Sequence, residues 1–485
     1  MTEYVDSFAW YPSRAHAAQS QLRSLMDRCD VLDIQTLHAL SVNNPSRYWD
    51  NVSQILGLGQ HALEVEKNLL AACVREWTGN YGTALVQEDE EGNLRQYSYT
   101  DLRKRVDKAV GGLAAAGVRK GDTIALLLPL YLDAVAILLA CATMGIICAV
   151  LSPLERDDLV ARALDQVRAK VVIVADRFNS GKVKVYTKSV ADRASVTARS
   201  LDAIVTIRFS GEGTSWLDGR DMWWDNLIER GSTNNKQRKD HSGDSSPQGH
   251  WTLLDLIPEP DQAVSVAPVS PLRSAHDLAF IFDVHPKDVV LWWTSAPGVW
   301  DPWAVIGTLI LGATLVIPKL SSERATIAHL FHLINSCDVS VLGCETSLVD
   351  HWTRQDTFQE QHMVVPRIIG STGAPLTTKQ WQWAFINLGR GNSPVINYYR
   401  NRRLGVGLLG CMTLMPIKAG AFTGPIAGVI ITIDSDNQFT ADVPRLATSI
   451  NRSLPSIGSI RSLPAAHNVG HVRIDSDGYW FLDLT

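Results

Sequence analysis

The sequence lacks the cysteine spacings that mark a metal site or a redox pair. Its seven cysteines are scattered, and none lies in a CxxC motif or at ligand spacing from a histidine. This absence excludes a zinc finger and a thioredoxin-like centre. An odd, scattered set of cysteines is typical of the reducing cytoplasm, where we expect this protein to reside.

The sequence also lacks an excess of charge of either sign. Lys and Arg together number 45, Asp and Glu together number 50, and the net charge is −5. This balance gives no general attraction to nucleic acid or to an anionic membrane, so we expect neither as a partner. The N-terminus, MTEYVDSFAWYPSR, is acidic and aromatic and does not resemble a signal peptide.

No apolar run is long and continuous enough to predict a membrane span. The longest candidate, residues 134–151, is interrupted by Thr143 and Gly145, so we predict a buried helix followed by a buried strand. The composition is that of a globular protein, with 46% hydrophobic and 20% charged residues. A length of 485 residues suits about three compact units.

Helical and strand patterns alternate along most of the chain. Helices are predicted within residues 15–26 and at 100–116 (with Thr100 as N-cap), 131–141, 157–167, 303–311 and 326–335, and strands at 122–128, 146–151, 171–175, 288–293, 314–317, 339–342 and 367–370. Such alternation is typical of doubly wound parallel sheets. We therefore predict an α/β fold with two doubly wound α/β subdomains and a small β-barrel-like subdomain.

The expected boundaries follow changes in this pattern. The units are a helical N-terminal cap at residues 1–75, a first α/β subdomain at 76–250, a second α/β subdomain at 251–428 and a small β subdomain at 429–485. Residues 234–249, NNKQRKDHSGDSSPQG, are polar and without periodicity. We predict that they form the linker that ends the first subdomain.

Several motifs occur in the order in which one known family carries them. They are WYPS from Trp10, SVNNPSRYW from Ser41, YSYTDLR from Tyr97, GVRKGDTIA from Gly117, KDVVLWWTS from Lys287, GATLV from Gly312 and STGAPL from Ser371. Together they resemble the adenylate-forming superfamily, near the branch of acetoacetyl-CoA synthetase and the plant acyl-activating enzymes. The resemblance implies the fold of that superfamily's large N-terminal domain, and chemistry in which ATP activates a carboxylate.

The resemblance also implies requirements for adenylation from which this sequence departs. In place of the family's glycine- and hydroxyl-rich phosphate loop stands LLDLIPEPDQAV, residues 253–264, with two prolines and three carboxylates. Proline lacks an amide donor, and carboxylates repel a triphosphate. In NYYRNRRLG, residues 397–405, Arg402 and Arg403 stand where the family has Thr and its magnesium-binding Glu.

Two further departures point the same way. His471 stands where the family has its ribose-binding Asp, and the sequence ends at Thr485, near the hinge that precedes the family's small C-terminal lid domain. We expect that domain to be absent and ordinary adenylation to be lost. We therefore expect no metal site and no cofactor, with neither ATP nor Mg²⁺ bound.

The resemblance places an acyl pocket along residues 293–303, 343–347 and 371–376, which supply aromatic walls and a few polar groups. Such a lining is typical of a small-molecule site. The predicted substrate-binding residues are Trp293, Trp300, Trp303, Cys344, Thr346, Ser371, Thr372, Gly373, Tyr399, Arg400, Arg402 and Arg403. For the three arginines two interpretations stay open: they bind an anionic ligand, or they form ion pairs with the acidic segment near Glu259 and Asp261.

Three residues are candidates for proton transfer: Glu345, His276 and His471. Each has a structural alternative, namely an exposed strand-end Glu345, a helix-borne His276 that does not face its neighbour Asp277, and a space-filling His471. Cys344 is either a nucleophile or, as we favour, a small core residue.

Three functions remain open. The first is an ATP-independent enzyme of specialised metabolism that acts on a small aromatic or acyl carboxylate, or its thioester, by acyl transfer, condensation or elimination. The second is a pseudoenzyme that binds a ligand, a protein partner or a carrier protein. The third is an atypical carboxylate-CoA ligase.

Overall fold

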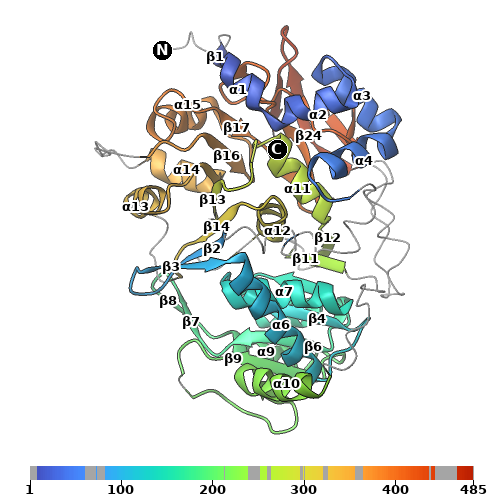
Figure 1. The fold of residues 1–485 in the computed structure, drawn as a ribbon, viewed down its shortest axis with the longest axis vertical. Coiled ribbons are helices and arrows are strands. Elements are labelled where there is room, and N and C mark those ends of the chain that lie inside the picture. The colour runs from blue at the N-terminus through green and yellow to red at the C-terminus, as the bar shows by residue number, and fades with distance from the viewer. Residues whose placement is uncertain are drawn as a thin grey trace.

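The computed structural model describes residues 8–59, 73, 82–211, 213–238, 252–258, 264–294, 299, 301–320, 326–354, 364–435, 438–442 and 467–483. Two seven-stranded sheets, mostly parallel and flanked by helices, dominate the fold. In Figure 1 helices α6, α7, α9 and α10 lie around the lower sheet, and α11–α15 lie with the upper one. The predicted doubly wound α/β architecture is confirmed.

The first sheet has the strand order β10-β9-β6-β4-β5-β11-β12 and is parallel except for β12. Its strands are β4 (Thr123–Leu127), β5 (Ile147–Leu151), β6 (Val171–Ala175), β9 (Ala203–Ile207), β10 (Asp221–Trp223), β11 (Thr252–Pro258) and β12 (Val264–Pro268), and its helices are α6 (Tyr99–Ala115), α7 (Leu132–Met144), α8 (Asp157–Gln166), α9 (Thr187–Ala194) and α10 (Trp224–Arg238). The short hairpin β7 (Phe178–Ser180) and β8 (Val183–Val185) lies outside the sheet.

The apolar run at residues 134–151 forms α7 and β5, as predicted. Nearly every residue of both elements is buried, because helices and neighbouring strands surround them on all sides. No helix within the described ranges combines the length and the apolar character needed to cross a membrane.

Two local predictions in this subdomain are wrong. Helix α6 is capped by Ser98 rather than Thr100, because Ser98 and Asp101 form a reciprocal capping box. Helix α10 continues to Arg238, so the first five residues of the predicted linker at 234–249 are helical. A polar, aperiodic composition therefore did not end this helix. The rest of the linker lies outside the described residues.

The second sheet has the strand order β17-β16-β15-β13-β14-β2-β3 and is parallel except for β3. Its strands are β2 (Thr83–Glu88), β3 (Leu94–Ser98), β13 (Val289–Trp293), β14 (Thr314–Ile317), β15 (Val341–Glu345), β16 (Ile368–Thr372) and β17 (Val395–Asn397), and its helices are α11 (Pro271–Phe280), α12 (Pro302–Ile310), α13 (Ile327–Cys337), α14 (Thr346–Thr353) and α15 (Thr378–Asn387). The predicted strand at 314–317 matches β14, and the other predictions here are correct to within a few residues.

The predicted boundary between the two α/β subdomains, between residues 250 and 251, does not separate the two sheets. Strands β2 and β3 join the second sheet through pairing with β14, and β11 and β12 join the first sheet through pairing with β5. Each sheet therefore takes strands from both sides of the expected boundary. The reason is that strand pairing is set by contacts between distant segments, which local composition does not report.

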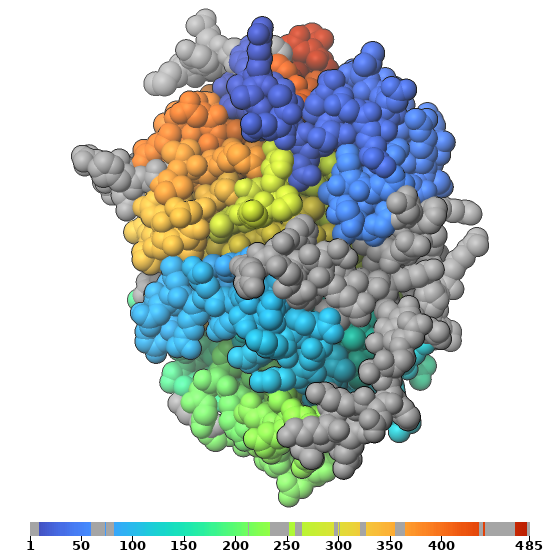
Figure 2. Space-filling model, in the orientation of Figure 1, coloured from blue at the N-terminus to red at the C-terminus, as the bar shows by residue number. Residues whose placement is uncertain are grey.

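The N-terminal region is largely helical, as expected, but it begins with a strand. Its elements are β1 (Phe8–Trp10), α1 (Arg14–Gln19), α2 (Gln21–Cys29), α3 (Ile34–Asn43) and α4 (Pro45–Ile55). The predicted helix within residues 15–26 is broken at Ser20, which caps α2. Figure 2 shows these helices, in blue, alongside the yellow-green segment that contains α11.

The C-terminal part contains small antiparallel sheets. One has the order β18-β19-β21 and another the order β22-β23-β24-β25. Their strands are β18 (Tyr399–Asn401), β19 (Val406–Gly410), β21 (Gly424–Pro425), β22 (Ile430–Ile433), β23 (Gln438–Asp442), β24 (His467–Ile474) and β25 (Trp480–Asp483), and β20 (Ile417–Lys418) pairs with β1. The two sheets bury Leu408, Phe422 and Val472 in one cluster. In place of a closed barrel, the described residues form open sheets that share a core.

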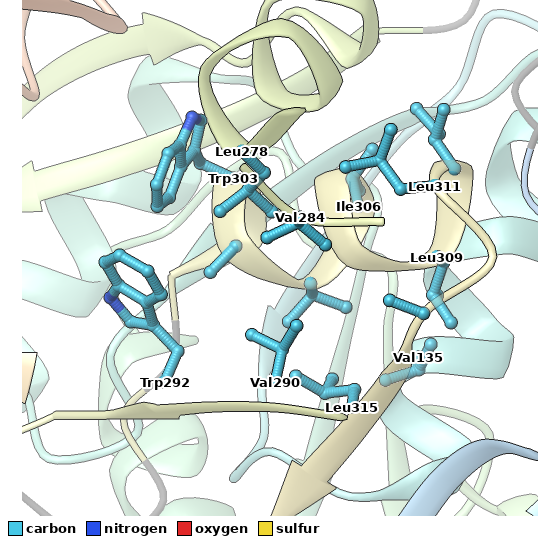
Figure 3. Packing of buried hydrophobic residues seen from close by; sticks show 14 of the residues in the cluster. Val135, Leu278, Val284, Val290, Trp292, Trp303, Ile306, Leu309, Leu311 and Leu315 are labelled. Atoms are coloured by element: carbon cyan, nitrogen blue, oxygen red, sulfur yellow. The ribbon is translucent and has the colours of Figure 1, made fainter. Parts of the chain in front are cut away.

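Helices α11 and α12 approach closely where Gly307 lies. A Cβ at this position would lie 2.6 Å from the carbonyl oxygen of Ser274. Figure 3 shows the apolar side chains of α12 packed toward β13 and β14, with Val135 of α7 beside them. The close spacing between α11 and α12 therefore requires glycine, which has no Cβ, at position 307.

We expect Gly307→Ala to destabilise the protein. The added methyl group must push α11 and α12 apart, and overpacking of this kind costs about 1–3 kcal/mol. The urea midpoint followed by circular dichroism measures the loss. Gly213→Ala is the control, because a Cβ there has no atom within 4 Å. Equal midpoints for both variants would contradict the argument.

Candidate functional site

The parallel register of the second sheet brings several predicted site residues into one row. Trp293 at the end of β13 pairs with Cys344 of β15, Cys344 pairs with Ser371 of β16, and Ser371 pairs with Asn397 of β17. Ligands of open α/β sheets bind beyond the carboxyl ends of their strands. The row lies at this edge, so the predicted pocket segments do meet where a ligand site is expected.

Hydrogen bonds fix the polar residues of this row. The buried Ser371 hydroxyl donates to the Asn397 side-chain oxygen at 3.3 Å, and the Asn397 amide donates to Gly420 O at 3.1 Å. The Thr346 hydroxyl donates to Thr372 O at 3.2 Å and also to Ala374 O. Asn397, which the sequence did not single out, thus ties the strand ends to the loop after β20.

Cys344 lies in the core, which favours the interpretation as a small core residue over that as a nucleophile. Its thiol is buried and donates to Gly370 O at 3.7 Å. Burial raises the pKa of the Cys344 thiol to about 12, so no reactive thiolate forms at neutral pH. Next to it, Glu345 is only half-buried and precedes α14. Gly373 follows β16 with a φ of 90°, which a side chain would strain.

The aromatic wall is built around Trp303. Its indole stacks on the Tyr398 ring, with centroids 5.4 Å apart, and meets Trp292 edge-on at 5.1 Å. Figure 3 shows the rings of Trp303 and Trp292 next to each other, from α12 and β13. Trp293 is buried on the other face of β13 against the His329 ring. Trp300 lies outside the described residues.

His276 and Asp277 do face each other, contrary to the argument from helical spacing. Nδ1 of His276 donates to the Asp277 carboxylate at 2.7 Å, and the Tyr48 hydroxyl donates to Nε2 at 2.8 Å. The Tyr398 hydroxyl donates to the other Asp277 oxygen at 2.7 Å. Side-chain rotation at adjacent positions allows this contact, which the spacing of Cβ atoms does not reveal.

This network is buried, and burial and neighbouring charges shift the pKa values of His276 and Asp277. Burial lowers the pKa of His276 below 6.5, against the opposing effect of Asp277. For Asp277, burial favours the neutral acid, but Arg273 and the hydrogen bonds from His276 and Tyr398 outweigh it and lower the pKa. Both ring nitrogens of His276 are engaged, so the geometry indicates that His276 joins α4 of the cap to α11.

The other proton-transfer candidates lie on different elements. His471 lies in β24, where it pairs with Gln438 and Asp483 across the small sheet. Glu345 ends β15, and its charge helps to raise the pKa of Arg402. The three candidates therefore occupy a helix, a small sheet and a large sheet.

The arginine cluster lies on β18 and the turn that follows it. Arg402 donates from Nε to Asp255 Oδ2 at 3.1 Å and from Nη2 to Asp255 Oδ1 at 2.9 Å. Asp255 is buried in β11 of the first sheet, whereas Arg402 is half-exposed. Burial alone would lower the pKa of Arg402, but Asp255 and Asp301 raise it. The ion-pair interpretation therefore applies to Arg402, with Asp255 as the carboxylate. Glu259 and Asp261 lie outside the described residues.

Arg400 is the buried member of the cluster. Its side chain is 3% exposed, and Nη1 donates to the carboxylate of Asp301 at 3.2 Å. Asp301 also caps α12 through the Trp303 amide. Tyr399 is half-buried, which raises the pKa of its hydroxyl to about 12, and Arg403 is exposed. Asp301 was missed from sequence, although an Asp-Pro pair before an apolar run is a helix-start signal.

In the described ranges, no group of three or more His, Cys, Asp or Glu side chains is arranged to hold a metal ion. Where the family resemblance expects a magnesium ligand, the cations Arg402 and Arg403 stand instead. The two oxygens of the nearby Asp255 already accept hydrogen bonds from Arg402. The residues present at this position therefore do not fit Mg²⁺.

His276→Gln should reduce stability and flatten its pH dependence. The lowered pKa means that the unfolded chain binds a proton first as pH falls below 6.5, so this part of the stability is present above 6.5 and lost below it. Loss of the two hydrogen bonds should cost about 1–3 kcal/mol at neutral pH. Urea unfolding at about pH 7.5 and about pH 5.5 measures both effects.

His332→Gln, on the exposed face of α13, is the matched control and should keep the wild-type pH dependence. The pKa values of His16 and His38 are also lowered, so the free energy of unfolding keeps a smaller dependence on pH in every variant. If the stability of His276→Gln changes with pH as steeply as that of the wild type, the role assigned to His276 is wrong.

The comparisons with known proteins agree with this architecture. The profile of the family described as AMP-binding enzyme matches residues 79–245. Acetyl-coenzyme A synthetase of Salmonella typhimurium is 23% identical over 437 residues, which cover 84% of this chain and 66% of that protein. The corresponding protein of Mycolicibacterium smegmatis is 25% identical over 358 residues, 71% of this chain and 37% of that protein. The chain thus spans less than two thirds of these relatives.

A solved structure shows the same fold. Acetoacetyl-CoA synthetase from Streptomyces lividans superposes with a TM-score of 0.78 at 16% identity, covering 98% of this chain and 80% of that one. The motifs along the sequence, the family profile and the shared fold lead to one assignment. Residues 79–245 match the AMP-binding enzyme family, and the chain as a whole is similar in sequence to acyl-CoA synthetases and in fold to acetoacetyl-CoA synthetase.

Proposed function

We propose that this protein binds a small carboxylate, or its acyl thioester, and acts on it without ATP or Mg²⁺ by acyl transfer, condensation or elimination. The names of its relatives, acetyl-coenzyme A synthetase and acetoacetyl-CoA synthetase, support a short acyl group. The row of residues at the carboxyl ends of β13, β15, β16 and β17 supports a site at that edge. The thioester would be presented on CoA or on a carrier protein.

The single observation that carries the loss of adenylation is the ion pair of Arg402 with Asp255. In the family, the matching position and its neighbour supply a hydroxyl and a carboxylate near the metal-bound phosphates. Here both oxygens of a buried carboxylate are taken by a guanidinium. A metal ion at Asp255 would have to displace the Arg402 guanidinium and would then lie close to a cation that repels it. The reaction that we propose therefore takes place without Mg²⁺.

A second candidate function is a pseudoenzyme that binds a ligand or partner without turnover. The state of the nucleophile and base candidates favours it. Both ring nitrogens of His276 are hydrogen-bonded, and the Cys344 thiol has a pKa of about 12. A protein with this site would keep the acyl pocket as a receptor.

ATP–pyrophosphate exchange tests the loss of adenylation. We expect no exchange above background with acetate, acetoacetate or benzoate, and no thermal stabilisation by Mg²⁺·ATP. The reason is that the Asp255 carboxylate is already bound by Arg402. An acetyl-CoA synthetase serves as the positive control. A signal in both assays would restore the third function, an atypical carboxylate-CoA ligase.

Incubation with the acyl thioesters of the same acids separates the first two functions. Release of free thiol or of a condensed product above the rate without protein supports the enzyme. Thermal stabilisation by a carboxylate or thioester without any product supports the pseudoenzyme.

A further inference from the structure

The buried guanidinium of Arg400 has hydrogen-bonding capacity that the protein leaves unused. One nitrogen, Nη1, donates to Asp301. Of the described polar atoms, Nε and Nη2 of Arg400 are among the few that are buried and have no hydrogen-bond partner. Buried donors without a partner are rare in native proteins, and a charged donor in this state is especially costly. This arrangement points to a group that the protein binds from solution.

The two unpartnered atoms lie on one edge of the guanidinium. Nε–H and the N–H of Nη2 that lies beside it are parallel and match the two oxygens of a carboxylate. Arg402, two residues further along, shows how such an edge is filled in this protein. Its Nε and Nη2 hold the two oxygens of Asp255 at 3.1 and 2.9 Å. The same edge of Arg400 has no such partner.

A third unpartnered donor lies close by. Nε1 of Trp303 is buried and has no hydrogen-bond partner, and the Trp303 ring centroid is 5.8 Å from Cζ of Arg400. Stacking on Tyr398 and edge-on contact with Trp292 fix the indole, so the N–H cannot turn to another acceptor. Two elements, β18 and α12, thus each contribute unused donors to one region.

We propose that Arg400 and Trp303 form the receptor for the carboxylate group of this protein's ligand. The Nε and Nη2 edge of Arg400 binds the two oxygens, the Trp303 indole N–H donates to one of them, and Asp301 positions the guanidinium through Nη1. This inference rests on the proposed function, because it assumes a carboxylate at this site. It replaces Arg402 and Arg403 by Arg400 as the anion-binding residue.

A carboxylate fits better than a phosphate. Asp301 contacts Arg400, and Asp255 lies near enough for Arg400 to influence its titration. Two neighbouring carboxylates repel a dianion more strongly than a monoanion. Inorganic phosphate is therefore the competing ligand against which a carboxylate must be compared.

The experiment uses the full chain and a panel of acetate, butyrate, acetoacetate and benzoate, each paired with its neutral amide or methyl ester, together with inorganic phosphate. Isothermal titration and thermal shift measure binding. We expect at least one carboxylate to bind and its neutral counterpart to bind at least about tenfold more weakly, as for loss of a charge-assisted pair. Phosphate should not displace the bound carboxylate.

Two variants locate the site. Arg400→Lys keeps the charge but removes the planar edge and should weaken carboxylate binding by about tenfold or more. Trp303→Phe keeps an aromatic ring and should weaken binding several-fold. Because Phe is smaller than Trp and leaves a cavity in the core, binding is measured at a temperature at which the ligand-free variant is fully folded. Arg354→Lys, at an exposed ion pair on α14, is the control.

The proposal is overturned if every carboxylate binds no better than its neutral counterpart, if phosphate binds in preference, or if both variants retain wild-type affinity. These outcomes are independent of ATP–pyrophosphate exchange. If the protein catalyses ATP–pyrophosphate exchange while its carboxylate binding still depends on Arg400, the proposed function is wrong and the carboxylate receptor stands.

Discussion

The ion pair between Arg402 and Asp255 is the contact on which the arrangement of the site depends. It connects β11 of the first large sheet with the turn after β18. Two residues earlier, Arg400 reaches Asp301 at the start of α12, on the second sheet. One short strand and the turn after it thus supply cations to carboxylates from both α/β parts. A surface pair would contribute little, but Asp255 is buried and needs its partner.

Behind this charge cluster, a chain of aromatic and polar side chains connects the site to the N-terminal cap. Tyr48 of α4 donates to His276, His276 to Asp277, and Tyr398 donates to Asp277 from the other side. Tyr398 in turn stacks on Trp303. The cap therefore helps to hold the Trp303 ring, whose centroid lies 5.8 Å from Cζ of Arg400.

Much of the fold was predictable from the sequence because it rests on local patterns. The strands at 171–175 and 314–317 were predicted with their observed bounds, and the buried helix and strand at 134–151 were predicted from apolar runs. Which strands belong to which sheet could not be predicted, because the pairing of β11 with β5 joins segments about a hundred residues apart. The candidate site shows the same limit. The arginines of β18 stood out in the sequence, but their partners Asp255 and Asp301, and the contact of His276 with Asp277, depend on tertiary packing and rotamers.

The central claim is that Arg402, paired with Asp255, and its neighbour Arg403 prevent this site from binding a nucleotide with its metal. Equilibrium dialysis of labelled ATP in the presence of Mg²⁺ tests this claim most directly. The account predicts equal concentrations of ATP on the two sides of the membrane at saturating protein. Retention of ATP on the protein side, abolished by chelation of Mg²⁺, would contradict it.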